Sequence, residues 1–188
     1  MNGEDIEYYN EEFRKINELY GDKIKLIFYG YKKEEDKLNV FEGVSYDYCK
    51  PVTIIHHFKQ IEDLDLDMLF IPLINDIKTH PKATKYNITS ERYNKFLEVG
   101  MFKIPVLTVN MPPYNILLKD EINSFIYPSK EKFMEYFNNL IEKKMGIIKI
   151  CGNHLHEMVM TEFNFSEYNI NLLSQVFSIP NEFKEEAV

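Results

Sequence analysis

One glutamate stands in a sequence setting that could bring it to a ligand. The stretch KFLEVGMFKIPVLTVNMPPYN, residues 95–115, combines an apolar-faced helix that ends at a Gly, a buried strand and a Pro-Pro turn. Glu98 lies inside that helix, near its C-terminal end. Because both oxygens of a carboxylate are acceptors, Glu98 could receive hydrogen bonds from a pair of hydroxyl groups. The alternative is a helix carboxylate that faces solvent or caps a neighbouring backbone group.

The turn NMPPYN after the strand could bind an anion. It would present the backbone amides of Tyr114, Asn115 and Ile116 at a helix N-terminus, where the helix dipole favours negative charge. A proline such as Pro113 suits the first helical position, because its missing N–H is not needed there. An ordinary strand-to-helix turn explains the same residues about equally well. Lys95 could add positive charge, although surface ion pairs are the more frequent role of such a lysine.

The other candidate ligands do not suggest a metal site. The run EDLDLD places Asp63, Asp65 and Asp67 at alternate positions, but it leads directly into the apolar strand 68–71. We therefore expect these carboxylates at the amino end of the sheet. Three histidines have no partner at metal-ligand spacing, namely His80, His154 and His156. We expect no metal and no cofactor.

Composition is typical of a compact cytoplasmic protein. The 188 residues, 45% of them hydrophobic and 14% aromatic, are enough for one domain with a substantial core. A net charge of −8 argues against a surface that binds nucleic acid or an anionic membrane. Cys49 and Cys151 are too few for a disulfide framework. An acidic, polar N-terminus and the lack of a long apolar run predict neither a signal peptide nor a transmembrane segment.

Periodicity predicts a single α/β domain. Short apolar runs predict strands near residues 24–29, 52–56, 68–71, 104–109 and 124–127. Apolar residues at helical spacing predict helices over 6–19, 58–66, 90–101, 114–121, 130–144, 145–163 and 166–177, with a long loop at 74–90. Strands that alternate with helices along the chain indicate a Rossmann-like parallel sheet with helices on both faces. Ligands bind such sheets at the carboxyl ends of the strands, here residues 29–32, 56–58, 73–76 and 110–115.

Three stretches, in this order and spacing, resemble a known family. They are INELYGDKIKLIFYGY (16–31), LDLDMLFIPLIND (64–76) and YNKFLEVGMFKIPVLTVNMPPYNILLKDEINSFIYPSKEKFMEYFNNLI (93–141). Together they resemble the nucleotide-sugar-binding C-terminal domain of group 1 glycosyltransferases of the GT-B fold. In that family a K-F-x-E-x-(G/A) helix leads into a P-V-(I/V) strand and a turn. The resemblance covers about residues 5–177 and implies the GT-B C-terminal type of fold.

The resemblance implies roles for individual residues. Glu98 corresponds to the second of two glutamates with seven residues between them, and this second glutamate binds the donor ribose. Ser90 stands at the first position, and Glu91 lies one residue off it. His57 stands where the family contacts the base, largely through backbone groups and stacking. The remaining residues expected at the nucleotide-sugar site are Lys95, Pro113, Tyr114 and Asn115.

The sequence also departs from the family pattern. Pro112 and Pro113 replace glycines that are usual in the turn, and Ser124 stands where a Gly is common. The family's donor domain opens with a strand and a Gly-rich turn before the first helix, and complete enzymes carry an acceptor domain as well. We therefore expect residues 1–188 to form a single donor-type domain that lacks its first strand and the acceptor domain. An unpaired strand edge would then favour a homodimer.

Two functional hypotheses follow. The first is a glycosyltransferase donor domain that binds a nucleotide-diphosphate sugar for transfer to an acceptor glycan or lipid-linked glycan in cell-envelope or polysaccharide synthesis. The second is a non-catalytic, degenerate donor-type module used for interaction or assembly. A receiver-type or flavodoxin-like signalling domain fits the α/β pattern alone, but the sequence lacks the acidic cluster that a phosphoacceptor site needs.

Overall fold

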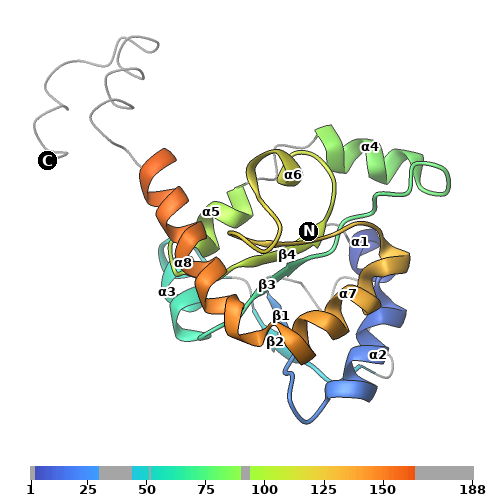
Figure 1. Cartoon of the computed structure of the whole chain (residues 1–188), viewed down its shortest axis with the longest axis horizontal. Helices are drawn as coiled ribbons and strands as arrows, with labels where there is room; N and C mark the ends of the chain where they lie inside the picture. The colour runs from blue at the N-terminus through green and yellow to red at the C-terminus, as the bar shows by residue number, and fades with distance from the viewer. Residues whose placement is uncertain (1–2, 30–43, 51, 90–93, 164–188) are drawn as a thin grey trace, which may run out of the picture.

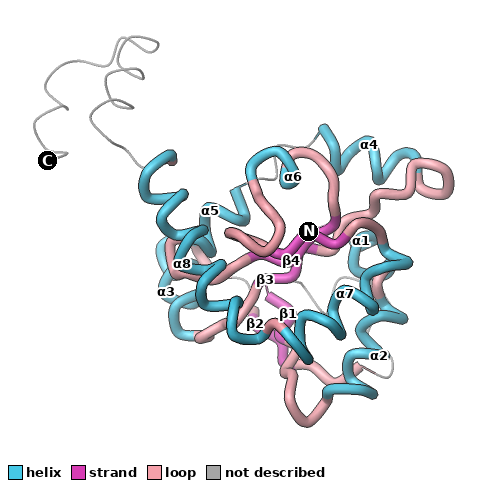
Figure 2. Tube along the Cα trace, viewed as in Figure 1, coloured by secondary structure: helices cyan, strands magenta, loops and turns pink. Residues whose placement is uncertain are grey.

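The computed structural model describes residues 3–29, 44–50, 52–89 and 94–163. In these residues short parallel strands are flanked by helices (Figures 1 and 2). The helices are α1 (Gly3–Tyr8), α2 (Asn10–Tyr20), α3 (Ile54–Asp63), α4 (Pro81–Thr89), α5 (Asn94–Gly100), α6 (Tyr114–Leu117), α7 (Lys130–Lys143) and α8 (Met145–Glu162). The strands are β1 (Ile27–Tyr29), β2 (Asp47–Cys49), β3 (Leu69–Ile71), β4 (Val106–Val109) and β5 (Phe125–Tyr127). None of the described helices is both long enough and apolar enough to span a bilayer.

All strand pairs within the described ranges are parallel, as predicted. β1 pairs with β2 and places Tyr29 opposite Cys49. β3, β4 and β5 form a second sheet in that order, with Thr108 of β4 opposite Ile71 of β3. The Thr108 hydroxyl also donates a hydrogen bond to the Ile71 carbonyl oxygen, at 3.2 Å. The mixed α/β class with parallel strands is therefore confirmed, although hydrogen bonds divide the strands into two small sheets.

Helices flank the strands on two sides. Figure 1 shows α1, α2 and α7 on one side of β3 and α3, α5 and α8 on the other. On the first side, the Phe70 ring of β3 lies 5.8 Å from Phe13 of α2 and 5.1 Å from Phe133 of α7, measured between ring centroids. On the second side, α5 packs against the end of α8, where Phe96 meets Phe163 at 5.7 Å. The first side thus buries aromatic area against β3, and on the second side an aromatic pair joins α5 to the end of α8.

A buried tyrosine pair links the N-terminal helices to the sheet. Tyr127 of β5 donates a hydrogen bond to the Tyr9 hydroxyl at 2.8 Å, and Tyr9 donates to the Leu73 carbonyl oxygen at 3.2 Å. Both side chains are fully buried. Burial raises the pKa of both phenols above the usual value, so both stay protonated and serve as donors. The pair holds the segment between α1 and α2 against the carboxyl end of β3.

Four predicted strands are present, but the strand predicted at residues 52–56 is wrong. α3 begins within those residues, at Ile54, directly after Thr53, whose backbone is extended. β-branched residues favoured a strand locally, whereas Phe58 and Ile61 continue an apolar pattern at helical spacing and Ile61 is buried. The second strand of the small sheet is instead β2, at residues 47–49.

The long loop predicted at residues 74–90 is also wrong, because it contains α4. Pro81 stands at the start of this helix, where its missing N–H costs nothing. The buried residues Ala83, Thr84 and Asn87 lie on one face of α4. Because two of the three are polar, the sequence shows no apolar periodicity that would predict this helix. The first predicted helix is divided at Tyr9 into α1 and α2. The helix predicted at 166–177 lies outside the described residues. Residues 30–43, which follow the strand expected to have an unpaired edge, also lie outside them.

The end of α5 is determined by a close crossing of α8. A Cβ atom on Gly100 would lie 2.7 Å from Cγ2 of Val159, and one on Gly152 would lie 1.9 Å from the Lys103 carbonyl oxygen. Lys103 itself has a φ of 62°, in the left-handed region. His156 of α8 donates from Nδ1 to the Gly100 carbonyl oxygen at 3.0 Å, which satisfies an acceptor at the helix end. This crossing explains why the helix that carries Glu98 stops at a glycine.

We expect Gly152→Ala to destabilise the protein, because its methyl group would collide with the Lys103 backbone. Overpacking of this kind costs about 1–3 kcal/mol. The melting temperature should therefore fall by about 3–10 °C in a thermal scan. Gly146→Ala is the matched control, since no atom lies within 4 Å of a Cβ at this position of the same helix. It should leave the melting temperature unchanged or raise it, and equal melting of the two variants would contradict the close crossing.

Candidate functional site

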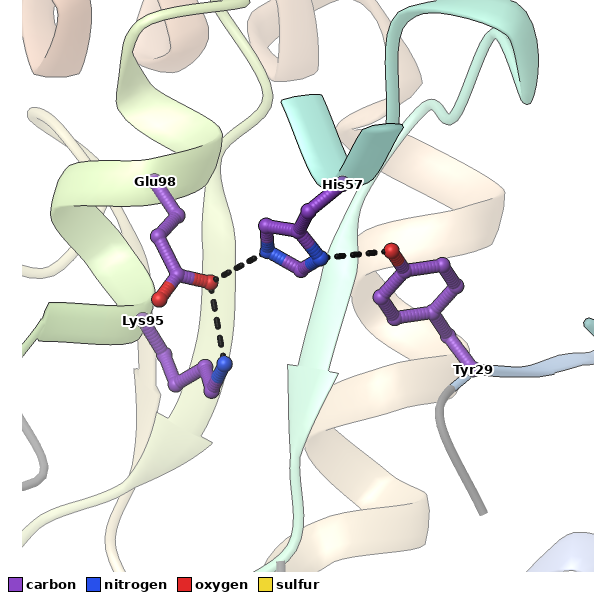
Figure 3. A network of polar contacts seen from close by, with 4 residues as sticks. All are labelled: Tyr29, His57, Lys95 and Glu98. Carbon is purple, nitrogen blue, oxygen red and sulfur yellow. Dashed lines mark hydrogen bonds and ion pairs between the residues drawn. The ribbon is translucent and has the colours of Figure 1, made fainter. Parts of the chain in front are cut away.

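Four polar side chains from three elements form a connected chain beside the sheet (Figure 3). The Tyr29 hydroxyl lies 2.6 Å from His57 Nδ1. His57 Nε2 lies 3.0 Å from Glu98 Oε2, and the same oxygen accepts a hydrogen bond from Lys95 Nζ at 2.9 Å. His57 and Glu98 are largely buried, with side chains 16% and 20% exposed. Three of the predicted site residues, His57, Lys95 and Glu98, are thus in direct contact.

The elements place these residues for simple geometric reasons. Tyr29 is the last residue of β1, and its neighbour Phe28 packs against Phe13 of α2. Because successive side chains of a strand point to opposite faces, Tyr29 points to the other face, towards α3 and α5. His57 lies in the first turn of α3. Glu98 lies one helical turn into α5, three residues after Lys95 and therefore on the same face of the helix.

The position of Glu98 answers the question that its sequence setting raised. Its carboxylate is separated by one imidazole ring from Tyr29, the residue at the carboxyl end of β1. His57 belongs to the first turn of a helix that follows β2, so it also lies towards the carboxyl ends of the strands. Ligands of parallel α/β sheets bind at these ends. Glu98 therefore lies near the carboxyl end of β1, the end of a parallel strand at which a ligand is expected, whereas α5 itself leads into the amino end of β4.

The chemistry of the groups determines the direction of the hydrogen bonds. A carboxylate can only accept, so the hydrogen between His57 and Glu98 belongs to His57 Nε2. A neutral imidazole then has a lone pair on Nδ1, which accepts a hydrogen bond from the Tyr29 hydroxyl. One neutral tautomer of His57 thus satisfies both contacts.

Tyr29 is a hydrogen-bond donor in this chain and not a nucleophile. Burial, followed by the nearby Cys49 and Glu98, raises the pKa of the Tyr29 phenol above its usual value. A phenolate is therefore disfavoured at neutral pH, although a tyrosine, a histidine and a carboxylate in series resemble the relay that activates a nucleophile. The arrangement suits binding better than covalent chemistry.

The two oxygens of Glu98 have different surroundings. Oε2 accepts from both His57 and Lys95, and Figure 3 shows Oε1 pointing away from the imidazole. Oε1 accepts no hydrogen bond from any described residue. Lys95 is 48% exposed and adds a positive charge beside the carboxylate. The site thus offers one acceptor oxygen and an adjacent cation.

The other predicted site residues are not joined to this chain. Ser90 and Glu91 lie outside the described residues. In the turn after β4, the amides of Asn115 and Ile116 donate to the carbonyl oxygens of Met111 and Pro113, each at 3.1 Å. The side chain of Tyr114 is buried, and that of Asn115 donates to Asn110 at 2.9 Å. The anion site expected at Pro113, Tyr114 and Asn115 remains a prediction. Of the three amides expected to bind the anion, those of residues 114–116, two donate to carbonyl oxygens inside the turn.

The remaining histidines and acidic residues have structural contacts. His154 and His156 both donate from Nδ1 to backbone carbonyl oxygens, those of Ile122 and Gly100. Asp63 forms an ion pair with Lys59 at 2.9 Å and is the last residue of α3, the helix that leads into β3, hence towards the amino end of the sheet as predicted. Among the residues that the structure describes, no three side chains are grouped as a metal site would require.

Sequence reasoning did not assign Tyr29 to the site. The residue was expected at the carboxyl end of a strand, but nothing in its spacing pairs it with His57. The two-residue period of side chains along a strand places Tyr29 on the face opposite to that of Phe28, and that was the available signal.

The His57–Glu98 contact should appear as a coupling energy in unfolding. In a double-mutant cycle built from His57→Asn and Glu98→Gln, we expect a coupling of about 0.5–1.5 kcal/mol in chemical denaturation, because both groups are largely buried. The matched control is the exposed pair Lys132 and Glu135 on α7, at 2.8 Å, which should couple by only about 0.2–0.5 kcal/mol. Additive effects at His57 and Glu98 would show that the two side chains do not interact.

No protein-family model matches this sequence, and searches of curated proteins and of solved structures find no significant match. The resemblance to group 1 glycosyltransferases therefore stays a prediction carried by the motifs. The candidate site is defined by its geometry alone.

Proposed function

We propose that this chain is a donor-type glycosyltransferase module that binds a nucleotide-diphosphate sugar, with Glu98 receiving the ribose hydroxyls. The observation that supports this best is the pair of contacts that joins Glu98 through His57 to Tyr29 at the carboxyl end of β1, with Oε1 directed away from His57. The K-F-L-E-V-G helix and the following I-P-V strand supply the family motif in the sequence. The sequence motif and the contacts of Glu98 both support this proposal.

The local chemistry suits a nucleoside. A carboxylate accepts hydrogen bonds from hydroxyl groups, and a charged acceptor makes these bonds stronger than neutral ones. Partial burial of Glu98 lowers the competition from water. Lys95 lies within reach of the same carboxylate and would contribute positive charge towards a diphosphate. Helix-end amides and cations can stabilise a departing diphosphate without a metal ion.

Transfer of the sugar requires more than this site. The acceptor hydroxyl of a glycan or lipid-linked glycan needs a general base and a surface that orients it. The proposed role of residues 1–188 is to hold the donor, and in the family an acceptor domain supplies the rest. We therefore expect the isolated chain to bind donor without turning it over.

A non-catalytic module is the second candidate, and one observation favours it. The amides of Asn115 and Ile116 are engaged with carbonyl oxygens inside their turn, where the family would use such a turn for phosphate. Prolines stand in place of the usual glycines at positions 112 and 113. A module of this kind would keep the fold and the contacts of Glu98 but would not bind nucleotide sugars.

We expect Glu98→Gln to weaken the binding of a nucleoside diphosphate or nucleotide sugar about tenfold or more. The substitution keeps the shape of the side chain but removes the charge that strengthens its hydrogen bonds, and a loss of about 1.4 kcal/mol corresponds to tenfold. Calorimetric titration with UDP- and GDP-linked sugars measures this effect. Glu135→Gln is the matched control, because Glu135 also accepts from a lysine three residues earlier, on the exposed face of α7.

The control variant should bind like the wild type. If the wild type binds none of the tested donors at millimolar concentration, the donor-site proposal fails and the non-catalytic module becomes the better account. Equal affinity of wild type and Glu98→Gln would instead place the nucleotide site elsewhere on the molecule.

A further inference from the structure

We propose that Tyr29 and His57 are positioning residues that hold Glu98 in its ligand-binding orientation, a role that rests on the proposed nucleotide-sugar site. Tyr29 acts on His57 through Nδ1, and His57 acts on Glu98 through Nε2. Neither residue needs to contact the ligand in this role. The orientation of Glu98 therefore depends on the series of contacts and not on a single side chain.

Glu98 benefits from such support because its side chain is long. An unsupported glutamate on a helix surface populates several rotamers, and a ligand that selects one of them loses affinity through the ordering cost. The bond from His57 Nε2 to Oε2 removes part of this freedom before the ligand arrives. Lys95 contributes less to orientation, because its own side chain is half exposed. Preorganisation therefore comes mainly from His57.

His57 can hold Glu98 only in one neutral tautomer. With hydrogen on Nδ1, the neutral ring would present the Nε2 lone pair to a carboxylate, and the two acceptors would repel each other. The Glu98 carboxylate, which can only accept, favours hydrogen on Nε2, and the Tyr29 hydroxyl adds to this preference by donating to the Nδ1 lone pair. The raised pKa of the Tyr29 phenol keeps its hydroxyl protonated, so it is able to donate to Nδ1. Tyr29 thereby supports the orientation of Glu98 across two hydrogen bonds.

The first test examines the protein without ligand. Ring nitrogen chemical shifts of His57, measured by NMR on the whole chain, distinguish the two neutral tautomers. We expect the Nε2–H form in the wild type and a larger share of the Nδ1–H form in Tyr29→Phe, which removes only the hydroxyl. A wild-type ring with hydrogen on Nδ1 would overturn the proposal, whether or not the chain binds nucleotides.

The second test measures affinity for UDP and GDP. Tyr29→Phe should bind the nucleotide about fivefold more weakly than wild type, the size of effect expected for one lost hydrogen bond that acts through another residue. Tyr20→Phe is the control, because its hydroxyl donates to Asn138 on α7, in a different part of the molecule. Equal affinity of wild type and Tyr29→Phe would overturn the positioning role.

A pair of His57 variants tests the atom through which the contact acts. The side-chain amide of Gln reaches the position of Nε2, whereas that of Asn reaches only the position of Nδ1. His57→Gln should therefore bind nucleotide more tightly than His57→Asn, since it can still donate to Glu98. The reverse order, or no difference, contradicts the proposal. A wild type that binds neither nucleotide refutes the proposed donor site, and the tautomer measurement then decides the internal contacts separately.

Discussion

The close crossing of α8 over residues 100–105 is the constraint on which the candidate site depends. Gly152 leaves just enough room for the Lys103 carbonyl group, and Gly100 leaves room for Val159 and Leu155. Because interiors are close-packed, neither helix can shift towards the other without a collision. The crossing therefore sets where α5 ends, where β4 begins and at what height Glu98 stands beside the sheet. Glu98 lies only two residues before the end of α5, so the packing of α8 determines its position.

A partly buried carboxylate is stable only with partners, and here it has two. His57 and Lys95 supply donors to one oxygen, and the polar chain continues to Tyr29 at the end of β1. Burying a charged group without such partners is costly. The same contacts that make Glu98 compatible with the fold also leave its second oxygen directed away from His57 (Figure 3). Structural support and ligand binding are therefore compatible roles for this residue.

The sequence predicted the elements whose local pattern agrees with their environment. β4 is buried at all four positions and α7 has a clear apolar stripe, so both were located. Residues 52–56 were misassigned, because a β-branched run suggested a strand while the packing of Ile61 required a helix. α4 was missed since its buried face is partly polar, with Thr84 and Asn87. The contact of Tyr29 with His57 could not be predicted, because periodicity specifies faces but not how two helices tilt over a sheet.

The central claim is that Glu98 binds the ribose of a nucleotide. The most direct measurement is a crystal structure of the chain with UDP or GDP bound. We predict that Glu98 Oε1 lies at hydrogen-bond distance, about 2.6–3.0 Å, from a ribose hydroxyl, with Oε2 still held by His57. A nucleotide bound away from Glu98, with the carboxylate contacting only protein and solvent, would contradict the account.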